Sequence, residues 1–129
     1  MSDDRYERGR KKFEEINPGA SDRIAERLKD IAPDFIRYID EFIFGDIFSR
    51  PGLDLKSRQI AIVAALTCLG NARPQLKAHI HNSLNVGWTR QEIVEVIMQM
   101  AIYGGFPVAL NGFDAAKEVF QERDALGQS

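Results

Sequence analysis

Residues 55–69, LKSRQIAIVAALTCL, decide the fold of this chain. Apolar side chains fill every position of the segment 60–66, so they cover all faces of a helix rather than one stripe. Asp54 is a suitable N-cap before this segment, and Gly70 is a suitable stop after it. We therefore expect a long helix at the centre of the fold, surrounded by other helices on all sides.

Elsewhere the apolar residues also recur with a period close to 3.6, which predicts an all-α fold. Proline and glycine mark the helix ends, and Thr89-x-x-Glu92 is typical of a capping box. The other expected helices span residues 3–16, a short segment capped by Ser21, residues 33–47 with Pro33 in the first turn, and residues 73–86, 90–103 and 107–124. These helices, about six or seven with the central one, are expected to form a single compact domain, residues 1–129.

Composition excludes several classes of protein. The 17 basic and 19 acidic residues nearly balance, and the basic ones are scattered, which disfavours nucleic acid as a partner. Cys68 is the one cysteine and cannot form an internal disulfide, which fits a reducing compartment. No apolar run reaches the roughly 18 residues of a membrane span, and the N-terminus lacks the apolar core of a signal peptide. We expect a cytoplasmic protein with no membrane partner.

The two histidines, His79 and His81, lie two positions apart on one expected helix. Two residues rotate a side chain by about 200° around a helix, so the two rings point to nearly opposite sides. A metal site would need ligands at helical spacing on one face, as in His-Glu-x-x-His. The sequence therefore predicts no metal. A lone helical histidine is more often a packed or solvated residue than a catalytic one.

Several short elements occur in a fixed order along the chain. They are Gly45-Asp46-Ile47-Phe48-Ser49-Arg50-Pro51-Gly52-Leu53, Arg58, His79, Gly87 and Tyr103-Gly104-Gly105-Phe106-Pro107. At these spacings the set resembles the signature of the carboxymuconolactone decarboxylase family, within the alkyl hydroperoxidase D-like superfamily, and the resemblance extends from about Arg5 to Phe120. It implies a decarboxylase without a cofactor, acting on 4-carboxymuconolactone or a similar small carboxylated lactone or keto acid in the protocatechuate branch of aromatic catabolism.

The resemblance also implies roles for four residues. His79 would be the general acid or proton shuttle, with an ordinary pKa near 6.5 that suits neutral pH. Asp46 would orient the ring of His79 or stabilise its charge. Arg58 or Arg50 would bind a substrate carboxylate through the bidentate fork of the guanidinium group.

Other readings of these residues remain open. Arg58 also suits an ion pair with Asp54 or Asp46, Arg50 suits a solvated turn, and Asp46 suits a polar position near a helix end. Two residues near the end of the third expected helix depart from the family pattern. Asp46 occupies the position of a glutamate, and Phe48 occupies that of a tryptophan. Gly104 likewise replaces a cysteine. These changes are consistent with a different substrate.

The superfamily also contains a thiol peroxidase, and here the sequence argues against that chemistry. The two cysteines that the peroxidase needs correspond to Ala72 and Gln75, and its proton-relay glutamate would fall near Gln59, which cannot ionise. Cys68 lies outside that motif. Thiol redox catalysis is therefore disfavoured.

Large apolar residues on the third and last expected helices exceed what one face of a small bundle needs, which favours a homo-oligomer. We expect the apolar stripe of the third helix to lie in the core or in a subunit contact. It consists of Phe35, Ile36, Ile39, Phe42, Ile43 and Ile47. The resemblance implies dimers grouped into trimeric rings. Besides the decarboxylase, two alternatives remain: a related member with another small-molecule reaction, and a non-catalytic helical oligomer.

Overall fold

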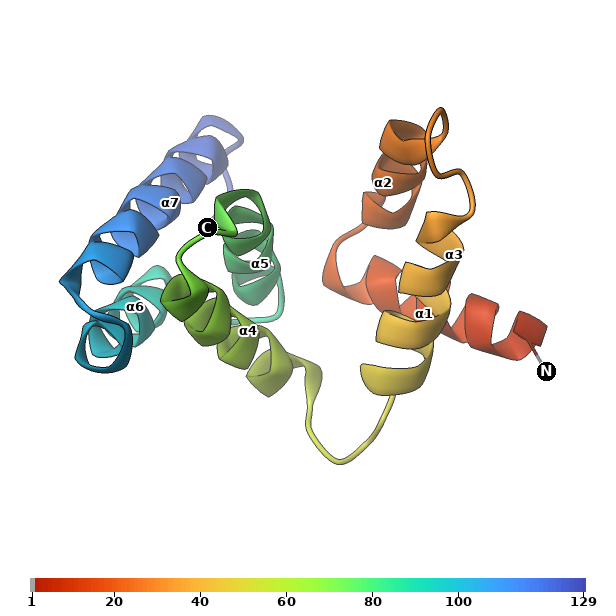
Figure 1. Ribbon diagram of the computed structural model, residues 1–129, viewed down its shortest axis with the longest axis horizontal. Helices are drawn as coiled ribbons and strands as arrows, with labels where there is room; N and C mark the ends of the chain where they lie inside the picture. The colour runs from red at the N-terminus through yellow and green to blue at the C-terminus, as the bar shows by residue number, and fades with distance from the viewer. Residues whose placement is uncertain (1) are drawn as a thin grey trace. The chain divides into compact units, whose positions relative to one another are not determined.

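The computed structural model describes residues 2–129, and every regular element among them is helical (Figure 1). The all-α prediction is therefore confirmed. The elements are α1 (Ser2–Ile16), α2 (Ala20–Leu28), α3 (Phe35–Tyr38), the π-helix η1 (Ile39–Ile47), α4 (Leu55–Leu69), α5 (Arg73–Asn85), α6 (Arg90–Gly104) and α7 (Phe106–Ala125). They gather into two compact units, Met1–Asp54 and Leu55–Ser129. One domain over residues 1–129 stays a prediction, and each unit is described by itself.

The first unit is built on the close approach of α1 and η1. Gly9 and Gly45 allow it, since a Cβ on Gly9 would overlap the carbonyl oxygen of Asp40 and a Cβ on Gly45 would lie 2.5 Å from that of Arg5. Beside this crossing the rings of Phe13 and Phe44 stack with their centroids 3.8 Å apart. Small residues therefore bring two helices together and let two aromatic rings fill the core.

Two expectations for this unit are wrong in detail. Ser21 does not cap α2, because its hydroxyl donates to the buried carboxylate of Asp40, 3.0 Å from each oxygen. Pro33 precedes the third helix, which begins at Phe35 and becomes a π-helix from Ile39 onward. At its end the N–H of Phe48 donates to the carbonyl of Ile43, five residues earlier.

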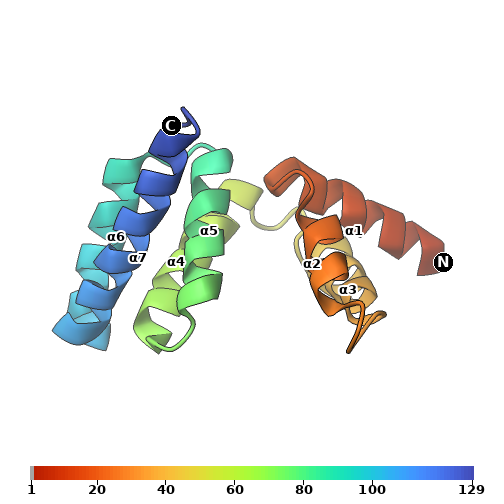
Figure 2. The same cartoon turned by 90° about the horizontal axis from the view of Figure 1, so that it is seen from above.

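The second unit is a bundle of α4, α5, α6 and α7, which Figures 1 and 2 show packed together. Its core consists of Val63, Leu76, Ile80, Ile93, Ile97, Ala115, Ala116 and Val119. The predicted bounds of its helices agree with the structure to within two residues. Gly70 and Gly87 follow α4 and α5 with φ of 75° and 109°, a conformation that glycine adopts without strain.

The prediction that other helices surround α4 on all sides is wrong for the single chain. Val63 and Thr67 are buried against the other helices, whereas Ala61, Ala65 and Leu69 are exposed in the single chain. One apolar face of α4 is thus not covered by its own bundle. No helix within residues 2–129 has the length and apolar character that crossing a membrane requires.

The capping box of α6 is present and gives a first testable prediction. Thr89 accepts from the N–H of Glu92 at 3.1 Å, and the Glu92 carboxylate accepts from the N–H of Thr89 at 2.9 Å. Thr89→Ala should lower the free energy of unfolding by about 1 kcal/mol, because it leaves an N-terminal N–H group of the helix without its acceptor. Urea denaturation measures this, and Thr89→Ser, which keeps the hydroxyl, should lose clearly less.

Candidate functional site

His79 lies on α5 and faces α4, where Gln59 provides its hydrogen-bond partner. The ring Nδ1 and the Gln59 Oε1 are 2.8 Å apart. Gln59 is completely buried, although it is a polar residue in a largely apolar helix. The packing of α5 on α4 therefore holds the His79 ring in one orientation.

Burial lowers the pKa of His79 from 6.5 to about 4. The cause is desolvation of the imidazolium, and no charged side chain among the described residues contributes to the lowered pKa. His79 is thus neutral at pH 7. This corrects the expectation of an ordinary pKa near 6.5: the ring must take up a proton before it can donate one.

The low pKa of His79 predicts a pH-dependent stability. The folded pKa lies below the unfolded one, so the unfolded chain binds the proton more tightly, and stability falls as the pH drops from about 6.5 to about 4. The loss should reach about 3 kcal/mol, the equivalent of that pKa difference. Chemical denaturation of the native chain and of His79→Gln across this range isolates the effect. Equal losses in both proteins would contradict it.

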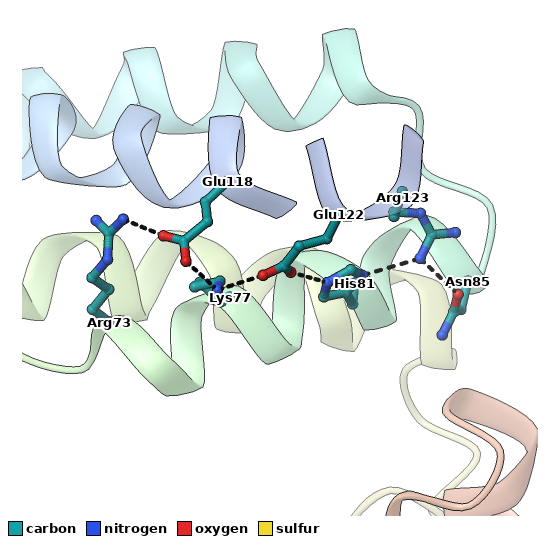
Figure 3. A network of polar contacts seen from close by, with 7 residues as sticks. All are labelled: Arg73, Lys77, His81, Asn85, Glu118, Glu122 and Arg123. Atoms are coloured by element: carbon teal, nitrogen blue, oxygen red, sulfur yellow. Dashed lines mark hydrogen bonds and ion pairs between the residues drawn. The ribbon is translucent and has the colours of Figure 1, made fainter. Parts of the chain in front are cut away.

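His81 points to α7 instead and belongs to a chain of polar contacts (Figure 3). Its Nε2 lies 2.9 Å from Glu122 Oε1, and its Nδ1 lies 3.3 Å from a guanidinium nitrogen of Arg123. Arginine can only donate, so Nδ1 accepts and Nε2–H donates to the carboxylate. The chain continues through Lys77 and Glu118 to Arg73. The separate surroundings of the two histidines, expected from their spacing, are confirmed, and His81 ties α5 to α7.

Asp46 lies at the end of η1, where two arginines of α1 engage it. Arg5 donates to both of its oxygens, at 3.0 and 2.6 Å, and a nitrogen of Arg8 lies 3.6 Å away. The hydrogen bond from Arg5 holds the pKa of this carboxyl group below its usual range, so Asp46 is ionised. The partner of Nδ1 of His79 is Gln59, and a role for Asp46 in the site stays a prediction.

The two predicted carboxylate-binding arginines differ in their surroundings. Arg58 lies on α4, next to Gln59, and is half-buried. Arg50 lies in the turn after η1, and its side chain is exposed. Arg58 and His79 belong to the same unit, whereas Arg50 belongs to the other. The roles of both arginines stay predictions.

A cavity of about 170 Å³ lies between α4, α5 and α7. Its polar lining comes from Thr67, Arg73 and Asn111, and His79 is not among the residues that line it. Among the side chains of residues 4–129, no three histidine, cysteine or acidic groups gather closely enough to hold a metal ion.

Sequence reasoning identified His79 through a resemblance but gave Gln59 no role in a site. The available signal was a lone amide within an apolar helix, since a buried polar side chain needs a partner. Which partner it finds depends on how α4 packs on α5.

The chain belongs to the Carboxymuconolactone decarboxylase family, whose profile matches residues 33–118. It is 32% identical over 124 residues to 4-carboxymuconolactone decarboxylase of Acinetobacter baylyi, covering 95% of this chain and 92% of that protein. It is 33% identical over 110 residues to an uncharacterized 15.0 kDa protein of Paracoccus denitrificans, covering 84% and 82%. With a nitrosuccinic acid decarboxylase of Metarhizium robertsii the identity is 29% over 90 residues, covering 70% and 62%. Two of these relatives are named decarboxylases, which supports the prediction of a carboxy-lyase.

Proposed function

We propose that this chain removes the carboxylate of 4-carboxymuconolactone, or of a closely similar small carboxylated lactone or keto acid, without a cofactor. The observation that carries this proposal is the similarity to a 4-carboxymuconolactone decarboxylase along nearly the whole of both chains. The reaction would serve the protocatechuate branch of aromatic catabolism in the cytoplasm. A half-buried, neutral histidine held by a neutral amide supports the proposal, because such a group can exchange a proton at a ring nitrogen.

The substrate explains why no cofactor is needed. Its carboxylate lies on a ring carbon that is conjugated through a double bond to the lactone carbonyl. When the bond to carbon dioxide breaks, its electron pair spreads into that carbonyl as a dienolate. The protein then has to hold the carboxylate, stabilise the negative charge that develops on oxygen and return a proton to carbon.

His79 is assigned the proton transfer. An anionic substrate close to the ring favours the imidazolium form and so raises its pKa, which opposes the effect of burial. The ring takes up one proton, carbon dioxide leaves, and the ring gives that proton to the dienolate carbon. Arg58 or Arg50 would hold the substrate carboxylate, and Asp46 would contribute through its charge.

A wider substrate range is the second candidate function. One relative is named a nitrosuccinic acid decarboxylase. In nitrosuccinate the electron pair left by carbon dioxide spreads into a nitro group, so that substrate also contains its own electron acceptor. Asp46 and Phe48, which depart from the family pattern, make such a shift in substrate reasonable.

The active form is proposed to be a homo-oligomer, a trimer of dimers. Exposed apolar side chains in both units support self-association, because large apolar surface on a monomer commonly marks an interface. In the first unit they include Phe35, Tyr38 and Phe42, and in the second Ile102, Tyr103, Phe106 and Leu110.

A direct assay tests the function. The purified chain is mixed with 4-carboxymuconolactone, generated in place by the preceding cycloisomerase, and the ultraviolet absorbance of the lactone is followed. Nitrosuccinate and a β-keto acid are tested in parallel. Turnover of the lactone alone supports the first candidate, and preference for nitrosuccinate supports the second. If the folded chain decarboxylates none of the three, the proposed function is wrong.

A further inference from the structure

Gln59 stands out among the residues near His79 because only half of its amide group is satisfied. Its side chain is completely buried, and its Oε1 contacts Nδ1 of His79 at 2.8 Å. Its Nε2 is buried and has no hydrogen-bond partner among the described residues. An unpaired buried amide donor costs about 1–3 kcal/mol of stability, so packing alone does not account for a glutamine here.

The contact determines where the proton of His79 sits. A neutral imidazole has one N–H group and one nitrogen lone pair. The carbonyl oxygen of Gln59 can only accept, so the 2.8 Å contact requires the N–H at Nδ1. The lone pair then lies on Nε2, which becomes the nitrogen able to take up a proton.

We propose that Gln59 is a positioning residue that keeps the N–H of His79 at Nδ1 and makes Nε2 the nitrogen that exchanges a proton with the substrate. The catalytic meaning of this proposal rests on the decarboxylase function proposed above. The placement of the proton itself concerns the free protein and does not depend on the substrate.

The same hydrogen bond serves both states of the ring. When Nε2 takes up a proton, Nδ1–H still donates to Gln59, so the ring does not have to turn between uptake and release. When Nε2–H gives the proton to the dienolate carbon, the ring returns to its starting form. A glutamate in place of Gln59 would stabilise the imidazolium by its charge and make it a weaker acid. The neutral amide orients the ring without that penalty.

Nitrogen NMR on the free, full-length protein tests the placement of the proton. The chain has only two histidines, so ¹⁵N-histidine labelling gives two ring systems, and a His81→Gln variant assigns them. At pH 7 we expect His79 to show a protonated Nδ1 and an unprotonated Nε2. The reverse tautomer, which would require the Gln59 amide to be turned around, would overturn the proposal.

Two variants then test the role of Gln59. Gln59→Leu removes the acceptor, so the preference for Nδ1–H should disappear; kcat should fall about tenfold or more while KM changes little. Gln59→Glu keeps the acceptor, so it should retain Nδ1–H and raise the pKa of His79 in the NMR titration. It should also move the basic limb of the pH–rate profile, along which His79 loses its proton, to higher pH. Should Gln59→Leu fail to fold, the titration of the nearly isosteric Gln59→Glu decides.

The outcomes separate the two proposals. If the native chain shows the expected tautomer but decarboxylates no substrate, the proposed function fails and the positioning by Gln59 stands. If Gln59→Leu keeps the Nδ1–H tautomer, or Gln59→Glu leaves the pKa of His79 unchanged, the positioning by Gln59 is wrong.

Discussion

A His79→Gln variant should decarboxylate 4-carboxymuconolactone on the order of 10²-fold to 10⁴-fold more slowly than the native chain, the range typical for loss of a general acid or base. Glutamine occupies a similar volume and can still form a hydrogen bond to Gln59, but it cannot take up and release a proton near neutral pH. The loss should therefore appear mainly in kcat. Stopped-flow or steady-state absorbance measurements give kcat for the native chain and for the variant.

His81→Gln is the matched control for this variant. His81 lies on the same helix, but its ring contacts Glu122 and Arg123 of α7. A glutamine there can still donate and accept, so kcat should stay within about twofold of native if His81 only ties α5 to α7. Equal losses in the two variants would show that disturbance of α5, rather than proton transfer, causes the effect.

Gly9→Ala should destabilise the first unit by about 3 kcal/mol, the upper part of the range for overpacking. The new Cβ would overlap the carbonyl oxygen of Asp40, a backbone atom of η1 that cannot rotate away. α1 and η1 would have to separate, which breaks the stacking of Phe13 on Phe44. This cost exceeds the gain of about 1 kcal/mol that alanine brings to a helix interior.

Hydrogen exchange locates that effect within the chain. In Gly9→Ala, amides of α1 and η1 should exchange faster than in the native protein, whereas amides in the core of the second unit should change much less. Gly52→Ala is the control, because a Cβ at Gly52 meets nothing within 4 Å. If Gly9→Ala is as stable as Gly52→Ala, the close crossing of α1 and η1 is wrong.

Much of the helical pattern follows from local chemistry and was predictable for that reason. Gly70, Gly87 and the Thr89–Glu92 capping box act within one turn of the helix that they end or begin, so sequence alone reveals them. The apolar period does the same for α4 to α7. The predicted ends of α4 to α7 therefore agree closely with the observed ones.

The first unit contains two features that local sequence patterns do not predict. Ser21 is a good N-cap residue by type, yet its hydroxyl bonds to Asp40, which is nineteen positions away. The π-helical turns of η1 coincide with the close crossing against Gly9, a contact between segments far apart in the sequence. Propensity cannot anticipate either feature, because both depend on how the helices pack.

The candidate site divides in the same way. The resemblance to the family selected His79 as the candidate catalytic residue, and its catalytic role stays a prediction. Its neutral state and the role of Gln59 arise from burial and from a contact between α4 and α5, so the sequence alone predicted an ordinary pKa. The participation of Asp46, Arg50 and Arg58 stays a prediction that substrate kinetics of their variants can test.

Release of labelled carbon dioxide tests the central claim most directly. The native chain and His79→Gln are each given 4-carboxymuconolactone labelled with ¹³C in the carboxylate on the ring, without added metal or cofactor, and ¹³CO₂ is measured against time. We expect one equivalent of ¹³CO₂ per lactone consumed by the native chain, and release slowed by about 10²-fold or more in the variant. No release by the folded native chain, or equal release by both proteins, would contradict decarboxylation through His79.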